Sequence, residues 1–179
     1  AYQLWTVSGA VNFYQSPVNI DSCIFSGNLS EDALNIVRSD FSLENSVFSA
    51  TKSDAIDIDF SNGKMSNLTI KKAGNDGIDI SGSQITIQDI RIDGVEDKAI
   101  SAGESSIISG HNILISNSEI VFASKDDSKI ELDSVDIDSS NLGFVVFQKK
   151  PEYGPGYIKL DNVKWDSLRE PYLVEKKST

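Results

Sequence analysis

The sequence predicts an all-β fold, a right-handed parallel β-helix (solenoid) of about seven coils with about 22 residues in each coil. Three observations support this prediction. An apolar position recurs every 22 residues, short runs alternate between apolar and polar residues, and long helical periodicity is absent. Gly, Ser, Asn and Asp separate the short runs, as expected where a solenoid turns a corner.

The 22-residue period is clearest at one apolar position. Because equivalent positions stack in successive coils, we expect these side chains to form one inward ladder: Leu34, Ile56, Ile78, Ile100, Phe122 and Phe144. A second series places a polar residue just before an apolar-x-apolar triplet. Its Asn and Asp members are expected to mark one turn, where side chains satisfy backbone groups: Asn67, Asp89, Asn112 and Asn162.

The whole chain, residues 1–179, is expected to form a single β-helix domain, and we expect it to be part of a longer protein. Residues 1–20 are expected to form an N-terminal coil or cap, and residues 21–165 the repeated coils. The last step of the repeat contains an insertion at residues 148–156. Residues 166–179 are expected to form a C-terminal tail or cap that covers the open end of the solenoid.

Charge and composition exclude several functions. A formal net charge of −11 argues against nucleic acid as a partner, since phosphate binding needs clustered Lys and Arg. There is no apolar run of about 18 residues, so membrane insertion is not expected. One Cys and one His exclude an intrachain disulfide and the zinc sites that need four Cys or His ligands, or three His ligands.

The coil pattern resembles the parallel β-helix repeats of the pectate-lyase-like superfamily over almost the whole chain. It resembles more closely the uncharacterised bacterial β-helix modules of secreted or surface proteins, some of which lie beside spore-coat-H-like or lamin-tail-like domains. The resemblance implies a secreted or cell-surface, non-catalytic module that binds carbohydrate or has a structural role. It is carried by the segments 31–39, 53–60, 74–79, 97–101, 123–126 and 148–155.

A second resemblance supports an alternative function. The stretch from Asn75 to Asp79 is similar to the N-T-D-G-x-D segment of polygalacturonase-type hydrolases, and Glu96 and Asp97 follow one coil later. His111 takes the place of a G-H-G histidine but comes too early, and no R-I-K segment follows. The alternative is a polysaccharide hydrolase, lyase or epimerase that uses stacked Asp residues. Its candidate catalytic residues are Asp76, Asp79, Glu96, Asp97 and His111.

Carboxylates beside the inward ladder are predicted to stack in lanes, one rung or about 4.8 Å apart. One lane contains Asn35, Asp57, Asp79 and Ser101, a second contains Asp32, Asp54, Asp76 and Lys98, and a third contains Val37, Asp59, Ser81 and Gly103. Stacked charges repel, and three explanations stay open: a solvated acidic face with raised pKa values, an acid/base pair acting on a sugar, or calcium. No cofactor follows from the sequence itself, but calcium would suit the oxygens of Asp54, Asp57, Asp59, Asp76 and Asp79.

The insertion is the one place where the repeat loses its rhythm. Lys149, Lys150 and Tyr153 are candidate ligand-binding residues, because two cations and an aromatic ring suit an anionic sugar. The alternative is a loop stiffened by Pro and Gly that caps the stack. The predicted partners are therefore a polysaccharide or neighbouring domains of the same chain.

Overall fold

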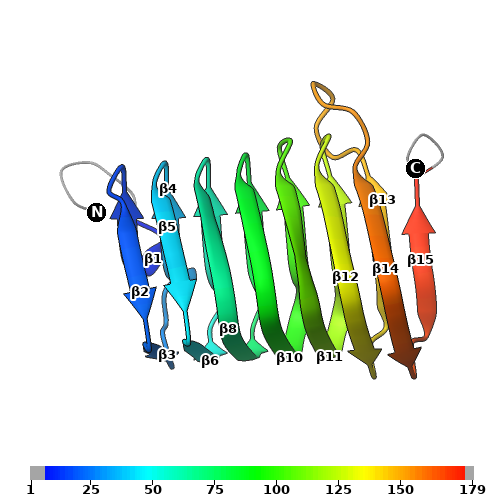
Figure 1. Cartoon of the computed structure of the whole chain (residues 1–179), viewed down its shortest axis with the longest axis horizontal. Coiled ribbons are helices and arrows are strands. Elements are labelled where there is room, and N and C mark those ends of the chain that lie inside the picture. The colour runs from blue at the N-terminus through cyan, green and yellow to red at the C-terminus, as the bar shows by residue number, and fades with distance from the viewer. Residues whose placement is uncertain (1–6, 176–179) are drawn as a thin grey trace.

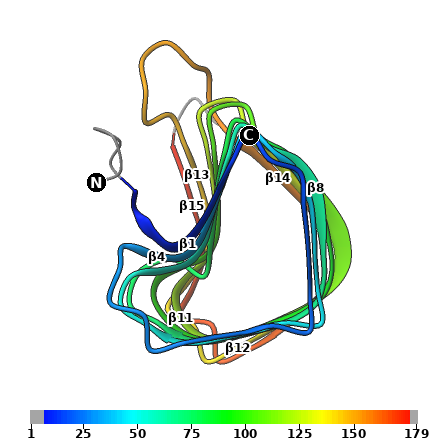
Figure 2. The same cartoon turned by 90° about the vertical axis from the view of Figure 1, so that its left-hand side faces the viewer.

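The computed structural model describes residues 7–175, and these residues form a right-handed parallel β-helix (Figure 1). Every pairing between strands is parallel. Viewed along its length, the chain winds around three faces (Figure 2). This confirms the predicted fold class and the repeat of about 22 residues.

The chain runs over three faces in every coil. The first face consists of β1 (Gly9–Tyr14), β4 (Asp32–Val37), β7 (Asp54–Asp59), β9 (Ile78–Ser81), the second parts of β10 (Gln84–Gly103) and β11 (Ile107–Lys125), β13 (Leu142–Phe147) and β15 (Glu170–Val174). The second face consists of β2 (Val18–Asp21), β5 (Asp40–Glu44), β8 (Asn62–Ala73), β10, β11, β12 (Lys129–Asp138) and β14 (Tyr157–Asp166).

The third face begins with β3 (Ile24–Ser26) and β6 (Val47–Thr51) and continues along the later parts of β8, β10, β11, β12 and β14. The second face is thus crossed by seven strands, which enclose six complete turns. The longer strands bend around the corner between two faces and are paired on both sides of it, and β10 and β11 shift register once, between Val95 and Lys98. No helix in the described part of the chain has the length and hydropathy needed to span a bilayer.

The predicted inward ladder is present in register. Leu34 pairs with Ile56, Ile56 with Ile78, Ile78 with Ile100, Ile100 with Phe122, and Phe122 with Phe144. The first five of these side chains are fully buried in the core. Burial of each is worth about 1.5–3 kcal/mol, so the ladder is a main source of the stability of the stack.

Left-handed backbone conformations turn the corner between the second and third faces. Asn45, Asn67, Asp89, Asn112 and Asn162 all have φ between 51° and 61°, a region that Asn and Asp tolerate better than most residues. The structure therefore confirms that the predicted Asn and Asp series marks one turn. We call this edge the asparagine corner.

A second ladder lies at the corner between the first and second faces, and the sequence analysis did not identify it. Each backbone N–H donates to the hydroxyl of the serine one coil later, at 3.0 Å from Ser39 to Ser61 and 2.8 Å from Ser61 to Ser83. The chain of bonds continues through Ser106 and Ser128, at 3.1 Å for each step. The recurrence of Ser every 22 or 23 residues was the signal in the sequence that could have revealed it.

The two ends of the solenoid differ from the middle. The cap expected over residues 1–20 and the tail expected over residues 166–179 lie partly outside the described residues. Within these segments, β1 and β2 belong to the stack, and β15 adds one more rung to the first face. Trp165 and Tyr172 occupy inward positions but are 53% and 68% exposed, because no described strand pairs beyond β14 and β15.

Candidate functional site

The acidic lanes lie on the first face, as the sequence predicts. Asn35, Asp57, Asp79 and Ser101 occupy consecutive rungs, and Asp32 pairs with Asp54. Beyond Ser101, the lane that contains Asp57 and Asp79 continues with the apolar residues Ala123 and Val145. The polar part of this lane is therefore its N-terminal half. Any chemistry of the acidic residues is therefore confined to β4, β7, β9 and the second part of β10.

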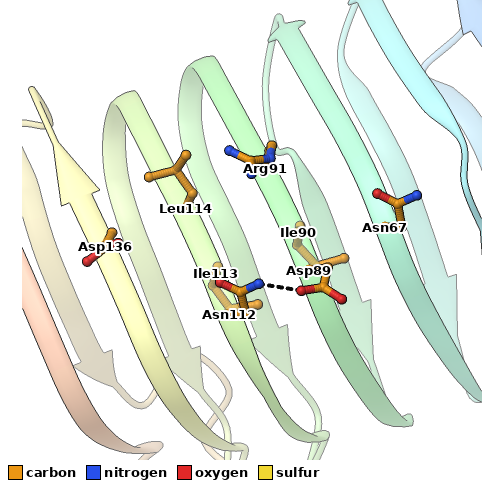
Figure 3. Close-up of a pocket in the computed structure, with 8 residues that line it drawn as sticks. All are labelled: Asn67, Asp89, Ile90, Arg91, Asn112, Ile113, Leu114 and Asp136. Atoms are coloured by element: carbon orange, nitrogen blue, oxygen red, sulfur yellow. Dashed lines mark hydrogen bonds between the residues drawn. The ribbon is translucent and has the colours of Figure 1, made fainter.

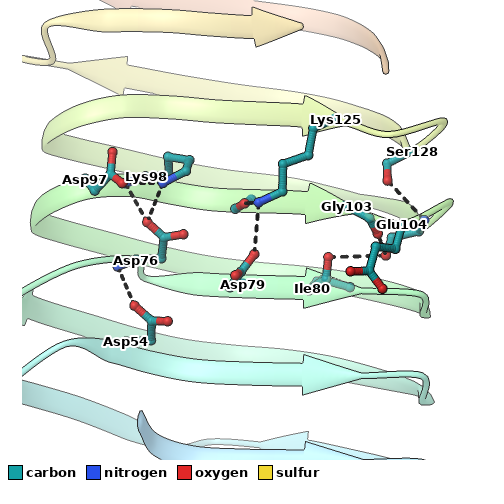
Figure 4. Close-up of polar contacts among 12 residues, drawn as sticks. Asp54, Asp76, Asp79, Ile80, Asp97, Lys98, Gly103, Glu104, Lys125 and Ser128 are labelled. Atoms are coloured by element: carbon teal, nitrogen blue, oxygen red, sulfur yellow. Dashed lines mark hydrogen bonds and ion pairs between the residues drawn. The ribbon is translucent and has the colours of Figure 1, made fainter. Parts of the chain in front are cut away.

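Two of the candidate metal ligands are occupied by backbone groups of the following coil. Asp54 Oδ1 accepts the backbone N–H of Asp76 at 2.9 Å and the Asn75 side-chain amide at 2.7 Å. Asp76 Oδ1 accepts the backbone N–H of Lys98 at 3.0 Å and lies 3.1 Å from Lys98 Nζ (Figure 4). These carboxylates therefore join one coil to the next.

Lys98 ends this lane, because a cation takes the place of a further carboxylate. Its ammonium group pairs with both Asp76 and Asp97 (Figure 4). Burial acts to lower the pKa of Lys98, but its hydrogen bonds to Asp97 and Asp76 outweigh burial and raise it. The predicted neighbours Asp76 and Asp97 are thus brought together, with a lysine between them.

Asp57 and Asp79 form the centre of the neighbouring lane. The amide of Asn35 donates to Asp57 Oδ2 at 2.7 Å. Two coils beyond Asp79, Lys125 reaches back so that its Nζ lies 3.7 Å from Asp79 Oδ1 and 2.9 Å from Ser101 Oγ (Figure 4). An amide thus contacts Asp57 and an ammonium group contacts Asp79, although the two side chains stand on adjacent rungs.

Burial controls the ionisation of these carboxyls. It raises the pKa of Asp57 to about 8, and the neighbouring charges of Asp59, Asp32 and Asp79 add to the shift. Burial also raises the pKa of Asp32 and of Asp76 to about 6, and it raises the pKa of Asp54 and Asp59. At pH 7 the Asp57 carboxyl therefore keeps its proton, and the first face carries less negative charge than its number of carboxyls suggests.

The predicted calcium ligands share this face without forming a recognisable cation site. Within residues 7–175, no three carboxylate, imidazole or thiol side chains come together in a group that could hold a metal ion. The structure also places two lysines against the lanes. Calcium binding by the acidic lanes stays a prediction of the sequence.

The remaining candidate catalytic residues lie apart from this cluster. His111 lies on the second face and is exposed, where it lines a shallow hollow with Glu131 and Lys159. Glu96 lines a different hollow, between the third and first faces, together with Lys52 and Lys72. The hydrolase-like set that the sequence suggested is therefore divided over three regions of the surface.

The insertion at residues 148–156 connects β13 to β14 and projects from the corner between the first and second faces (Figures 1 and 2). Asp126 is buried beneath it, and its Oδ1 accepts the backbone N–H groups of Lys149 and Lys150, each at 2.7 Å. The Lys150 ammonium group pairs with Glu104 at the edge of the first face. We call this segment the insertion loop; it holds the exposed Lys149 and the partly exposed Tyr153, and it lies three rungs beyond Asp79.

The asparagine corner has its own chain of side-chain hydrogen bonds. Asn67 donates to Asn45 at 2.8 Å, and Asn45 donates to Asp21 at 2.7 Å. The chain stops at the next rung, because Asp89 accepts from Asn112 and has no N–H to donate to Asn67. A hollow of about 300 Å³ lies at this break, and we call it the corner hollow (Figure 3).

Among known proteins, the likeness to this chain is limited to solved structures. No protein-family model matches the chain, and no curated protein matches it. The chain is similar to the catalytic domain of a GH87 alpha-1,3-glucanase in complex with nigerose, at 12% identity and a TM-score of 0.42, over 89% of this chain and 47% of that one. For a second such domain, in complex with tetrasaccharides, the values are 11% identity and a TM-score of 0.37, over 82% of this chain and 47% of that one. The chain thus spans about half the length of these solved domains.

Proposed function

We propose that this chain is a non-catalytic β-helix module that binds carbohydrate on the first face, in a secreted or cell-surface protein of the bacterial type. One observation carries the proposal. Four carboxylates of the first face, Asp54, Asp57, Asp76 and Asp79, are engaged by backbone N–H groups, side-chain amides and two lysines, while the insertion loop, three rungs beyond Asp79, holds the exposed Lys149 and the partly exposed Tyr153. The lanes therefore form a rigid polar surface, and the loop provides the groups that contact a ligand.

The chemistry of the insertion loop suits an acidic polysaccharide. Lys149 is an exposed cation, and a tyrosine ring offers an apolar surface to the face of a sugar. The hydrogen bonds that the Lys149 and Lys150 backbone N–H groups donate to Asp126 hold the backbone of the loop in place. A loop that is already ordered loses less entropy when a ligand binds.

The test is a polyuronate array combined with a reducing-sugar assay. We expect binding without release of reducing ends, and affinity that falls as salt rises. Lys149→Ala with Lys150→Ala should weaken binding by about tenfold or more, or about 1.4 kcal/mol. The matched control is Lys71→Ala with Lys72→Ala, which removes the same charge from exposed positions on the third face. Loss of stability with unchanged binding would show that the loop is a cap.

A second candidate function rests on Asp57 and Asp79. They stand on adjacent rungs, about 4.8 Å apart along the sheet, and burial raises the pKa of Asp57 to about 8. A carboxyl that keeps its proton at pH 7 can act as a general acid on a sugar, and glycosidases place a second carboxyl close to it. Release of reducing ends from a polyuronate that is lost in Asp57→Asn would favour this hydrolase-like or lyase-like function over the first.

Calcium and neighbouring domains complete the proposal. Calcium bound only by the native chain would raise the melting temperature, and a chelator would lower it. Asp57→Asn with Asp79→Asn should then abolish the response, and an unchanged melting temperature removes calcium from the proposal. The exposed inward residues Trp165 and Tyr172 support a partner at the C-terminal end of the stack, which we propose is a neighbouring domain of the same protein.

A further inference from the structure

The break in the hydrogen-bond chain of the asparagine corner leaves several groups without partners. Asn67 Oδ1 and Asn112 Oδ1 accept no hydrogen bond from any residue of the described chain, because the residue that follows each on the corner supplies no amide. Both asparagines line the corner hollow, and Asp89 lies between them (Figure 3). Two amide oxygens at the corner, Asn67 Oδ1 and Asn112 Oδ1, are therefore acceptors without a donor in the described chain.

Arg91 supplies donors at the same place. It lies on the outer surface of β10 and makes no hydrogen bond or ion pair with any residue in the range 7–175. Asp89 accepts from Asn112 and from Gln88, the latter at 3.0 Å, but not from the guanidinium group. A guanidinium group has five N–H donors in a fixed plane, and in Arg91 none of them has a hydrogen-bond partner in the described chain.

The charges and the apolar surface of the corner hollow indicate which class of ligand it can bind. The lining holds one guanidinium group and two carboxylates, Asp89 and Asp136, so its net charge is negative and an anion is disfavoured. A bare cation is disfavoured by the guanidinium group itself. Leu114 lies between Arg91 and Asp136 and is 37% exposed, which adds an apolar patch. A neutral molecule with several hydroxyl groups meets these conditions, because each hydroxyl donates to one oxygen and accepts from one N–H.

We propose that the corner hollow is a binding site for a neutral sugar unit with neighbouring hydroxyl groups. The hydroxyls donate to Asn67 Oδ1 and to Asp89 and accept from Arg91, while the C–H face of the ring packs on Leu114. The volume of about 300 Å³ is at the lower limit for a small-molecule site and suits a single sugar unit. The lining residues come from β8, β10, β11 and β12, which are paired strands, so the site is formed before the ligand arrives.

This site is independent of the function proposed for the first face. The asparagine corner joins the second and third faces, whereas the insertion loop projects from the corner between the first and second faces (Figure 2). Binding in the hollow should depend little on salt, because the ligand is neutral. Binding of an acidic polysaccharide at the loop should weaken with salt, so the two sites are separable in one titration series.

The test uses the whole chain and the methyl glycosides of glucose, mannose and galactose. We expect at least one to shift the NMR signals of the Arg91 Nε–H and the Asn67 and Asn112 side-chain amides, at up to about 100 mM, which detects millimolar affinity. Arg91→Met keeps an unbranched apolar stem and removes the donors, and it should weaken binding about tenfold or more. Asn67→Gly removes the amide oxygen while retaining the left-handed backbone conformation, and it should weaken binding as well.

Lys71→Met is the matched control, since Lys71 is an exposed cation on the third face outside the hollow, and it should leave binding unchanged. The proposal is overturned if none of the three glycosides shifts the corner signals. It is also overturned if the shifts occur only at the insertion loop, or if Arg91→Met binds as well as the wild type. Thermal melts of both variants show whether each one is folded.

Discussion

Carboxylates on the first face and carboxylates at the asparagine corner stand on equally spaced rungs of one solenoid, but their pKa values shift in opposite directions. On the first face, burial raises the pKa of Asp57 to about 8 and that of Asp76 to about 6. At the corner, hydrogen bonds from Asn45 and Asn112 lower the pKa of Asp21 and of Asp89. Equal spacing along the stack thus does not produce equal ionisation.

The difference shows what controls charge in a repeated structure. At the corner, the residue on the following rung is an amide, which stabilises the charged form of the carboxylate by a hydrogen bond, and water is close by. On the first face, the following rung brings another carboxylate, as with Asp57 and Asp79, and the strands remove water. The identity of the next residue in the lane and the depth of the lane decide ionisation together.

The largest effect should come from breaking the scaffold that both regions share. Ile78→Asp places a charge in the fully buried ladder between Ile56 and Ile100. It should cost more than about 4 kcal/mol and unfold the chain. The control Ile107→Asp makes the same change at a position that is 43% exposed and should keep the fold. Far-UV circular dichroism and thermal melts distinguish the two, and an unaltered melt for Ile78→Asp would show that the register is wrong.

A smaller loss is expected when the corner is broken. Asp89 has φ of 54°, so Asp89→Ala introduces backbone strain of about 1–2 kcal/mol and removes the acceptor for Asn112. Asp89→Gly removes the same side chain without the strain, so it should be less destabilising than Asp89→Ala. Denaturant unfolding measures both, and equal losses would mean that the left-handed conformation carries no cost at this corner.

On the first face, removal of a carboxyl should stabilise the fold, whereas at the corner it destabilises the fold. Asp57→Asn removes a carboxyl that the folded chain holds protonated, while the amide oxygen still accepts from Asn35. It should stabilise the fold at pH 8 by about 1–3 kcal/mol after allowance for solvent screening, and by very little at pH 4. In thermal melts this is about 2–4 °C for each kcal/mol. A destabilised variant at pH 8 would show that the charged form of Asp57 is needed.

The two regions together predict an acid-shifted stability profile. A carboxyl with a raised folded-state pKa keeps its proton where the unfolded chain has lost it, so Asp32, Asp57 and Asp76 make stability fall as pH rises from about 4 to about 8. Asp21, Asp89 and Asp133 have lowered pKa values and contribute stability that is lost as pH falls below about 4. Melts across this range should show a maximum between about pH 4 and 6, and a maximum above pH 7 would contradict the assignment.

The sequence predicted the parts of this comparison that follow from the period. The inward ladder, the acidic lanes and the Asn and Asp turn all repeat every 22 or 23 residues. Their stacking could therefore be inferred from the spacing alone. The serine ladder has the same spacing and was overlooked because serine is common in turns. The corner hollow could not be predicted from the apolar period. That period describes the inward side chains, whereas the polar groups of the hollow belong to outward side chains.

Contacts that span more than one coil could not be inferred in this way. Lys125 reaches Asp79 across two coils, and Lys150 reaches Glu104 from the insertion loop. The direction of a long side chain decides such pairs, and the period carries no information about it. The hydrogen-bond chain of the asparagine corner breaks at Asp89 because a carboxylate cannot donate to Asn67. This break can be seen only when the side chains on neighbouring rungs are compared.

The most direct test of the central claim is a carbon-detected NMR titration of the aspartate carboxyl groups, which follows individual residues in one sample. Asp57 and Asp89 are the decisive pair, because one lies in the acidic lane and the other at the asparagine corner. The account predicts that Asp57 titrates near pH 8 and Asp89 below its ordinary pKa of 3.8. If both carboxyls instead titrate together near pH 4, burial and the next residue in the lane do not set ionisation in this solenoid.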